Sequence, residues 1–117
     1  VVFTKIRPEY PKTYEECCEV LKTTRIHIEG LSLEEVGRIK SFIQLLRCRD
    51  AYWKRAGDWR PEFRFGKKKY CIMTKDNKII SATVEETNRT LVFPTAEMRD
   101  AFYVNFKELI EECKEFL

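Results

Sequence analysis

The sequence predicts a single α+β domain with two N-terminal helices, a three-stranded antiparallel β-meander, and a long C-terminal helix packed on the sheet. Three observations support this class. Apolar residues recur at helical spacing in residues 13–55 and 95–117, whereas they alternate with polar residues in residues 69–93. Turn-forming residues divide the alternating stretch into three short strands. Helices and strands that are segregated along the chain are typical of α+β folds.

The length and composition are those of one globular domain. The chain has 117 residues, of which 44% are hydrophobic and 35% are charged, and its net charge is +3. A chain of this length buries roughly two-thirds of its unfolded surface, so it needs no disulfide or metal for stability. We expect an extended segment at residues 1–12, a helical part at residues 13–56, and the sheet with its covering helix at residues 69–117.

Two capping boxes mark the starts of the N-terminal helices. Thr13 and Ser32 are each followed three residues later by a glutamate, a pattern in which the hydroxyl caps the first turn. The first helix is expected to end near Lys22, and the alternation of residues 25–29 favours a short strand after it. The second helix is expected to reach about Arg55, where the following glycine is placed to terminate it.

Two predicted turns set the register of the strands. Residues 76–77 (Asp-Asn) both tolerate positive φ, so they suit a two-residue hairpin turn that pairs Cys71 with Ala82. A second turn at residues 87–88 pairs Ala82 with Phe93. The two registers place these apolar residues on one face of the meander: Cys71, Met73, Ile80, Ala82, Val84, Leu91 and Phe93.

The C-terminal stretch predicts one long amphipathic helix. Pro94 ends the last strand, and Thr95 is placed to cap the helix. The apolar residues at helical spacing form one face: Met98, Phe102, Phe106, Leu109, Cys113 and Phe116. The opposite face carries glutamates: Glu108, Glu111, Glu112 and Glu115. We expect the apolar face to cover the sheet, while the glutamates are either solvated or meet a basic segment.

Cysteine and histidine usage argues against a disulfide framework and a metal site. The five cysteines are odd in number and fall at apolar positions, which is typical of buried free thiols in a reducing compartment. There is no C-x-x-C pair, and His27 is the only histidine. The sequence shows neither a signal-peptide pattern nor an apolar run long enough for a membrane span, so we expect a cytoplasmic protein with no cofactor.

Four stretches cover much of the chain: residues 11–19 (PKTYEECCE), 49–53 (RDAYW), 69–72 (KYCI), and residues 93–94 leading into 102–116. Together they resemble a family of uncharacterised small proteins encoded in the genomes of gut bacteria and in their phages or integrated elements. The resemblance implies a cytoplasmic setting linked to mobile elements. It carries no known activity and no catalytic residues.

Charge is unevenly distributed along the chain. Residues 38–69 contain eleven Lys or Arg against three acids, a net charge of +8, whereas residues 85–117 carry a net charge of −4. Aromatic residues are interleaved with the basic ones: Tyr52, Trp53, Trp59, Phe63 and Phe65. Cations with aromatic faces are suited to nucleic acid. The alternative is a solvated helix face with aromatics that anchor a loop.

We expect a non-enzymatic interaction module, with a protein partner or self-association favoured over nucleic acid bound by residues 38–69. The acidic helix face and the basic segment are complementary in charge. An enzyme is not expected, since Asp50, Asp58 and Glu62 lack the partners of a catalytic site and no Gly-rich phosphate loop is present. The predicted contact residues are Trp53, Arg55, Trp59, Arg60, Arg64, Lys67 and Lys68.

Overall fold

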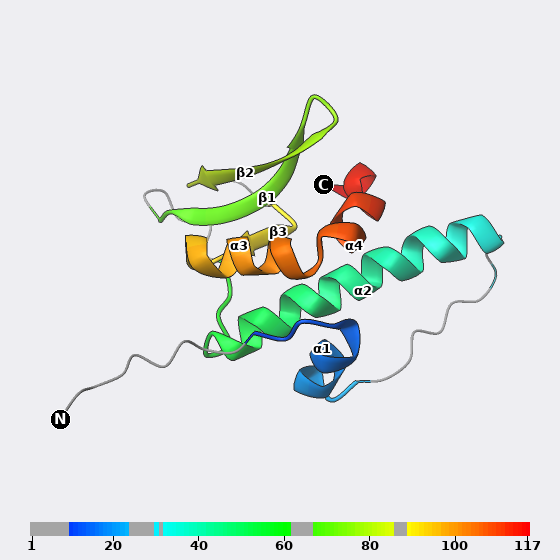
Figure 1. Ribbon diagram of the computed structural model, residues 1–117, viewed down its shortest axis with the longest axis horizontal. Coiled ribbons are helices and arrows are strands. Elements are labelled where there is room, and N and C mark those ends of the chain that lie inside the picture. The colour runs from blue at the N-terminus through cyan, green and yellow to red at the C-terminus, as the bar shows by residue number, and fades with distance from the viewer. Residues whose placement is uncertain (1–9, 24–29, 31, 62–66, 86–88) are drawn as a thin grey trace.

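The computed structural model of the protein describes residues 10–23, 30, 32–61, 67–85 and 89–117. In these ranges the chain forms four α-helices, one 3₁₀ helix and a three-stranded antiparallel sheet (Figure 1), which confirms the α+β class. The elements are α1 (Tyr14–Leu21), α2 (Leu33–Arg55), β1 (Lys69–Lys75), β2 (Lys78–Val84), β3 (Leu91–Phe93), α3 (Ala96–Asn105), α4 (Lys107–Glu112) and η1 (Lys114–Phe116). The predicted strand at residues 25–29 and turn at residues 87–88 lie outside the described residues.

The predicted caps of the two N-terminal helices are confirmed. The Thr13 hydroxyl accepts a hydrogen bond from the N–H of Glu16 at 3.1 Å, and the Ser32 hydroxyl accepts one from the N–H of Glu35 at 3.2 Å. Each bond satisfies a donor that the first turn of a helix leaves without an intrahelical partner. The second helix, α2, ends at Arg55 as predicted and spans 23 residues.

The predicted hairpin between β1 and β2 is also confirmed. Lys75 pairs with Lys78, and Cys71 pairs with Ala82, in the expected register. Asp76 has φ 52° and Asn77 has φ 62°. Positive φ at both central residues is the geometry of the type I′ turn, whose twist matches the twist of the strands.

The predicted meander is wrong, because the strand order is β2-β1-β3 and β3 pairs with β1. Phe93 lies opposite Tyr70 rather than Ala82. Burial distinguishes β2 from the two other strands. In β1 both Cys71 and Ile72 are buried, although they point to opposite faces, and all three residues of β3 are buried, whereas every residue of β2 is exposed or half-buried. The least buried strand, β2, therefore takes the open edge, and β3 takes the edge next to α2.

The new pairing also corrects the predicted apolar face. Residues opposite one another in a sheet share a face, so Phe93 lies on the face of Tyr70 and Ile72, not on that of Cys71. The ring of Phe93 is 4.9 Å from the ring of Phe102 in α3. The helices therefore cover the Tyr70 face of the sheet, which is opposite to the predicted apolar face of Cys71.

The predicted single C-terminal helix is broken at Phe106. Thr95 caps its start as expected, accepting a hydrogen bond from the N–H of Met98 at 3.1 Å. Phe106 then has φ −125° and ψ 26°, which is not helical, and α4 begins at the next residue. Beyond the break Cys113 is buried as predicted, but Ile110 is buried in place of Leu109, which is half-buried.

The break turns the chain from the sheet onto α2, as Figure 1 shows. There the ring of Phe116 lies 4.7 Å from the ring of Phe42. The glutamate face meets the same helix. The Ser41 hydroxyl donates to Glu112 at 3.2 Å, and the Arg38 guanidinium lies 3.4 Å from the carboxylate of Glu115. The acidic face is thus partly paired with α2 within one molecule.

All five cysteines are free and buried, as the sequence predicts. Burial raises the pKa of Cys71, and it raises the pKa of Cys113 to about 11. These thiols are accordingly protonated side chains of the core. None of the helices in the described ranges is long and apolar enough to cross a membrane.

Candidate functional site: a basic pocket beside Trp59

Four of the seven predicted contact residues line one surface pocket of about 500 Å³. They are Trp59, Arg60, Lys67 and Lys68. Pro61, Lys69 and Pro94 complete the lining. The pocket lies where three parts of the chain meet, namely the segment after α2, the start of β1 and the end of β3. We call it the basic pocket.

Trp59 is positioned by a tight reversal at the end of α2. Gly57 has φ 75° and Asp58 has φ 58°, so two consecutive residues adopt the left-handed conformation. Glycine does so freely, and aspartate is among the few other residues that tolerate it. The N–H of Trp59 then donates to the carbonyl of Trp53 at 3.0 Å. The reversal folds the Trp59 ring back onto the helix.

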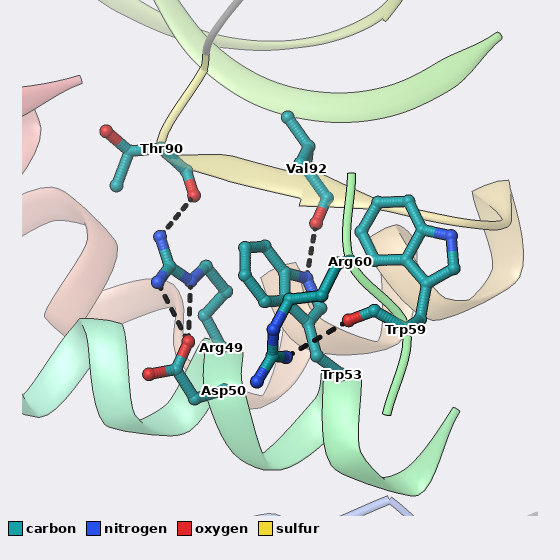
Figure 2. Close-up of polar contacts among 7 residues, drawn as sticks. All are labelled: Arg49, Asp50, Trp53, Trp59, Arg60, Thr90 and Val92. Atoms are coloured by element: carbon teal, nitrogen blue, oxygen red, sulfur yellow. Dashed lines mark hydrogen bonds and ion pairs between the residues drawn. The ribbon is translucent and has the colours of Figure 1, made fainter. Parts of the chain in front are cut away.

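Trp53 supports Trp59 from beneath rather than lining the pocket. Only 7% of Trp53 is exposed, and its indole N–H donates to the carbonyl of Val92 at 2.7 Å (Figure 2). The two indole rings meet edge to face, with centroids 5.6 Å apart. We therefore revise the predicted contact role of Trp53, because its polar atom and most of its surface are engaged in the core.

Two arginines lie against the ring of Trp53. The guanidinium carbon of Arg49 is 4.1 Å from the ring centroid, and that of Arg60 is 5.7 Å away. Arg49 also donates to the carbonyl of Thr90 at 3.0 Å and pairs with Asp50 at 2.8 Å (Figure 2). Arg49 is accordingly part of the packing, whereas Arg60 is exposed at the mouth of the basic pocket.

Lys69 is the residue of this site that the sequence analysis did not select. Its side chain is buried, with 2% exposure, and its ammonium donates to the carbonyl of Glu85 at 2.8 Å. A second, longer contact reaches the carbonyl of Lys67 at 3.4 Å. Both contacts place the ammonium of Lys69 against carbonyl dipoles next to the pocket. The alternation of β1 could have indicated this burial, because Lys69 and Cys71 lie on the same face of the strand.

The electrostatics of the pocket favour an anion. Arg60, Lys67 and Lys68 are exposed. None of the described residues that line the pocket is acidic. A concave site with charge of one sign and low-dielectric walls concentrates the field and attracts ligands of the opposite charge. The ring of Trp59, half-buried beside these cations, adds an apolar surface.

The remaining predicted residues lie elsewhere. Arg55 lines a separate pocket of about 420 Å³ together with Glu16 and Glu19, so its surroundings are of mixed charge. Arg64 lies outside the described residues. On α2, the Arg47 guanidinium donates to the hydroxyl of Tyr14 at 2.9 Å, and Lys54 donates to the carbonyl of Val20 at 3.0 Å. The basic residues of α2 are thus spread over several faces and intramolecular contacts.

The described residues show no arrangement suited to holding a metal ion. No group of three or more His, Cys, Asp or Glu side chains among them is placed to hold a metal ion. The carboxylate of Asp50 is paired with Arg49 (Figure 2), and Asp58 is exposed in the reversal after α2. His27 and Glu62 lie outside the described residues. What the basic pocket offers chemically is recognition of negative charge next to an aromatic ring.

The fold and the pocket together define an α+β protein with a tryptophan-lined, cationic surface pocket. Comparison of the chain with protein-family models, with curated proteins and with solved structures finds no match. The resemblance to small proteins of gut bacteria and their phages stays a prediction.

Proposed function

We propose that this protein is a non-enzymatic interaction module that binds an acidic segment of a partner protein in the basic pocket. The observation that carries the proposal is the convergence of Trp59, Arg60, Lys67 and Lys68 around one cavity. Tryptophan and arginine are the residues most enriched among those that dominate protein interfaces. The surrounding lysines supply charge that steers an acidic partner and orients it.

The distribution of charge favours a protein segment over nucleic acid. Binding to a nucleic acid backbone commonly engages several phosphates in a row, and its affinity rises with the number neutralised. Two cations of α2 that could extend such a track are engaged internally, Arg47 with Tyr14 and Lys54 with the carbonyl of Val20. A pocket of about 500 Å³ suits a few acidic side chains and one apolar residue packed on Trp59.

Single-stranded nucleic acid is the second candidate. The observation in its favour is the half-buried ring of Trp59 beside the consecutive lysines Lys67 and Lys68. Bases stack on aromatic rings while nearby cations contact the phosphates. This mode would require only a short stretch of strand at the pocket.

The test compares two probes of equal negative charge at low salt. One is a fluorescent peptide of Asp and Glu residues with a single Leu, and the other is a single-stranded DNA oligonucleotide. Fluorescence anisotropy is expected to show that the peptide binds more tightly. Substituting Arg60, Lys67 and Lys68 together by Ala is expected to weaken binding at least about tenfold, because it removes the exposed cations of the pocket.

The matched control removes the same charge elsewhere, with Lys40, Lys75 and Lys107 substituted together by Ala. All three are exposed and none lines the pocket, and the control is expected to retain affinity to within about threefold, since the Coulomb interaction falls with distance. Tighter binding of the oligonucleotide, also lost in the pocket variant, would favour the second candidate. Absence of binding to either probe, or equal losses in the two variants, would contradict the pocket as the binding site.

A further inference from the structure

The two edges of the sheet differ in how their backbone groups are satisfied. The outer edge of β3 is covered by α2, from which Arg49 donates to the carbonyl of Thr90 and Trp53 to that of Val92 (Figure 2). The other edge is β2, because the strand order is β2-β1-β3. In Figure 1, β2 lies on the side of the sheet away from α1 and α2. Among the described residues, no strand pairs with its outer side.

The register identifies which groups of β2 point outward. In a hairpin with a two-residue turn, the residues that flank the turn exchange hydrogen bonds, and bonded and non-bonded pairs then alternate. Lys75 and Lys78 flank this turn. The N–H and C=O groups of Ile80 and Ala82 therefore point to β1. Those of the alternate residues, Ile79, Ser81 and Thr83, point away from the sheet.

The other side of the sheet supports the same assignment. The carbonyl of Val92 accepts from Trp53, so it points away from β1. Its opposite residue, Cys71, must then direct its own backbone groups toward β2, where it meets Ala82. The geometry of the turn and the hydrogen bond to Val92 thus indicate the same alternation of inward and outward backbone groups in β2. Ser81 and Thr83 are exposed, and Ile79 is half-buried.

This edge lacks the features by which proteins protect edge strands from pairing. Such features are proline, bulges, short length and charged side chains within the strand. β2 has seven residues with no proline, its register with β1 runs without a bulge, and Lys78 at its first position is its one charged residue. The strand is therefore a template for another strand.

We propose that β2 pairs with β2 of a second copy of the chain, antiparallel and about a two-fold axis at Ser81. The outward groups are symmetric about Ser81, which makes the strand complementary to itself. Ser81 meets Ser81 of the other copy, and Ile79 meets Thr83. Three pairs of outward residues exchange two hydrogen bonds each. The result is one continuous sheet made from the strands of both copies.

Charge and space are both compatible with this pairing. Because the strands run in opposite directions about Ser81, Lys78 lies opposite Val84 of the other copy. Lys78 is the one charged residue of the strand, so no like charges meet along it. The helix α3 packs on β1 and β3. The two β2 strands therefore separate the helices of the two copies.

The first experiment is amide hydrogen exchange by NMR on the whole chain at low and high protein concentration, with light scattering on the same samples. We expect the mass to rise toward that of two chains. The amides of Ile79, Ser81 and Thr83 should become protected as it rises, whereas those of Ile80 and Ala82 are protected throughout. A chain that stays monomeric overturns the proposal, as does association that leaves the Ser81 amide exchanging freely.

Substitutions at Ser81 provide the matched test. Ser81→Pro removes an outward N–H without removing a bond to β1, since edge strands accept proline where the N–H faces solvent. Ser81→Lys places two like charges opposite one another at the two-fold axis, which opposes pairing. This variant provides the test if the proline disturbs folding. Both are expected to abolish the concentration-dependent mass increase, whereas Ser81→Thr keeps it. Retained association in a folded Ser81→Lys variant overturns the proposal.

This interface is independent of the basic pocket. The triple substitution of Arg60, Lys67 and Lys68 by Ala is therefore expected to associate like the unmodified chain. If that variant loses anion binding but still associates through β2, the result supports the proposed pairing of the two β2 strands. Loss of pairing in that variant, with its fold intact, would count against Ser81 as the centre of the interface.

Discussion

Tyr52 is the residue on which the core converges. Its side chain is fully buried. Its hydroxyl donates to the carbonyl of Pro11 at 3.0 Å and accepts from the amide of Asn105 at 2.9 Å. Burial raises the pKa of Tyr52, so the hydroxyl stays protonated and available as a donor. Its ring contacts four others: Tyr10, Phe93, Phe102 and Phe106. One side chain thus joins the segment before α1, the sheet and α3.

Removing that hydroxyl by Tyr52→Phe is expected to lower the free energy of unfolding by about 1–3 kcal/mol. The physical reason is that the Pro11 carbonyl and the Asn105 amide lose a buried partner, which costs more than an exposed hydrogen bond contributes. Urea denaturation followed by circular dichroism measures the change. Tyr103→Phe, at a half-buried tyrosine of α3, is the control and should change stability by less. Equal effects of the two substitutions would contradict the role given to Tyr52.

The burial of Lys69 could not be predicted from residue types alone. It ends a run of three consecutive lysines, and composition does not distinguish it from Lys67 or Lys68. Its burial follows from its place as the first residue of the central strand, beside the connection that crosses from β2 to β3. The ammonium donates there to the carbonyl of Glu85. The pairing of β1 with β2 brings that carbonyl within reach, because it places Lys69 opposite Val84.

At the scale of elements, the contact between α2 and β3 depends on a match of spacing. Arg49 and Trp53 are four residues apart on a helix, which is about 6 Å of rise. Thr90 and Val92 are two residues apart on an extended segment, which is about 6.7 Å. Two donors on one helix face therefore meet two successive outward carbonyls of the strand, as Figure 2 shows. The helix satisfies an edge that would otherwise need another strand.

The substitution Arg49→Met tests this contact. It keeps an apolar stem next to Trp53 but removes the donor to the carbonyl of Thr90, and we expect the free energy of unfolding to fall by about 1–3 kcal/mol. The control is Arg55→Met on the same helix, where the side chain is exposed. Its effect should stay within about 0.5 kcal/mol. Equal destabilisation in thermal unfolding would show that the charge of α2, and not the edge contact, matters.

At the scale of the whole molecule, the order of the sheet determines where every other part lies. With β1 at the centre, β3 reaches α2 and its buried residues join the core, while β2 is left as an open edge. The basic pocket follows from the same order. Lys69 begins the central strand and Pro94 follows the neighbouring one, so both lie beside the reversal that carries Trp59.

A cysteine introduced by Val92→Cys tests the strand order directly. Val92 lies opposite Cys71 in the present order. The two residues form a non-hydrogen-bonded pair, whose Cα atoms are about 4.5 Å apart, within the range for a disulfide. Mild oxidation is expected to link them, and mass spectrometry of the digested protein locates the link. Leu91→Cys is the control, since its side chain lies on the other face. A meander would place β2 between the two thiols and prevent the link.

The parts that the sequence by itself determined are the local ones. The caps at Thr13, Ser32 and Thr95 and the turn at residues 76–77 each depend on hydrogen bonds or φ angles within four residues of chain. The residues that make such a feature are neighbours, so their types suffice to predict it. Four residues of the candidate site were also predicted, because charge and aromatic content are visible without a fold.

Tertiary structure decided the rest. The pairing of β3 with β1, the break at Phe106, the burial of Trp53 and the separation of Arg55 from the basic pocket all depend on residues distant in sequence. The physical reason is competition for burial. Several pairings satisfy the local pattern of residues 69–93 equally well, and the one that forms lets β1 be covered on both faces while α2 satisfies the edge of β3.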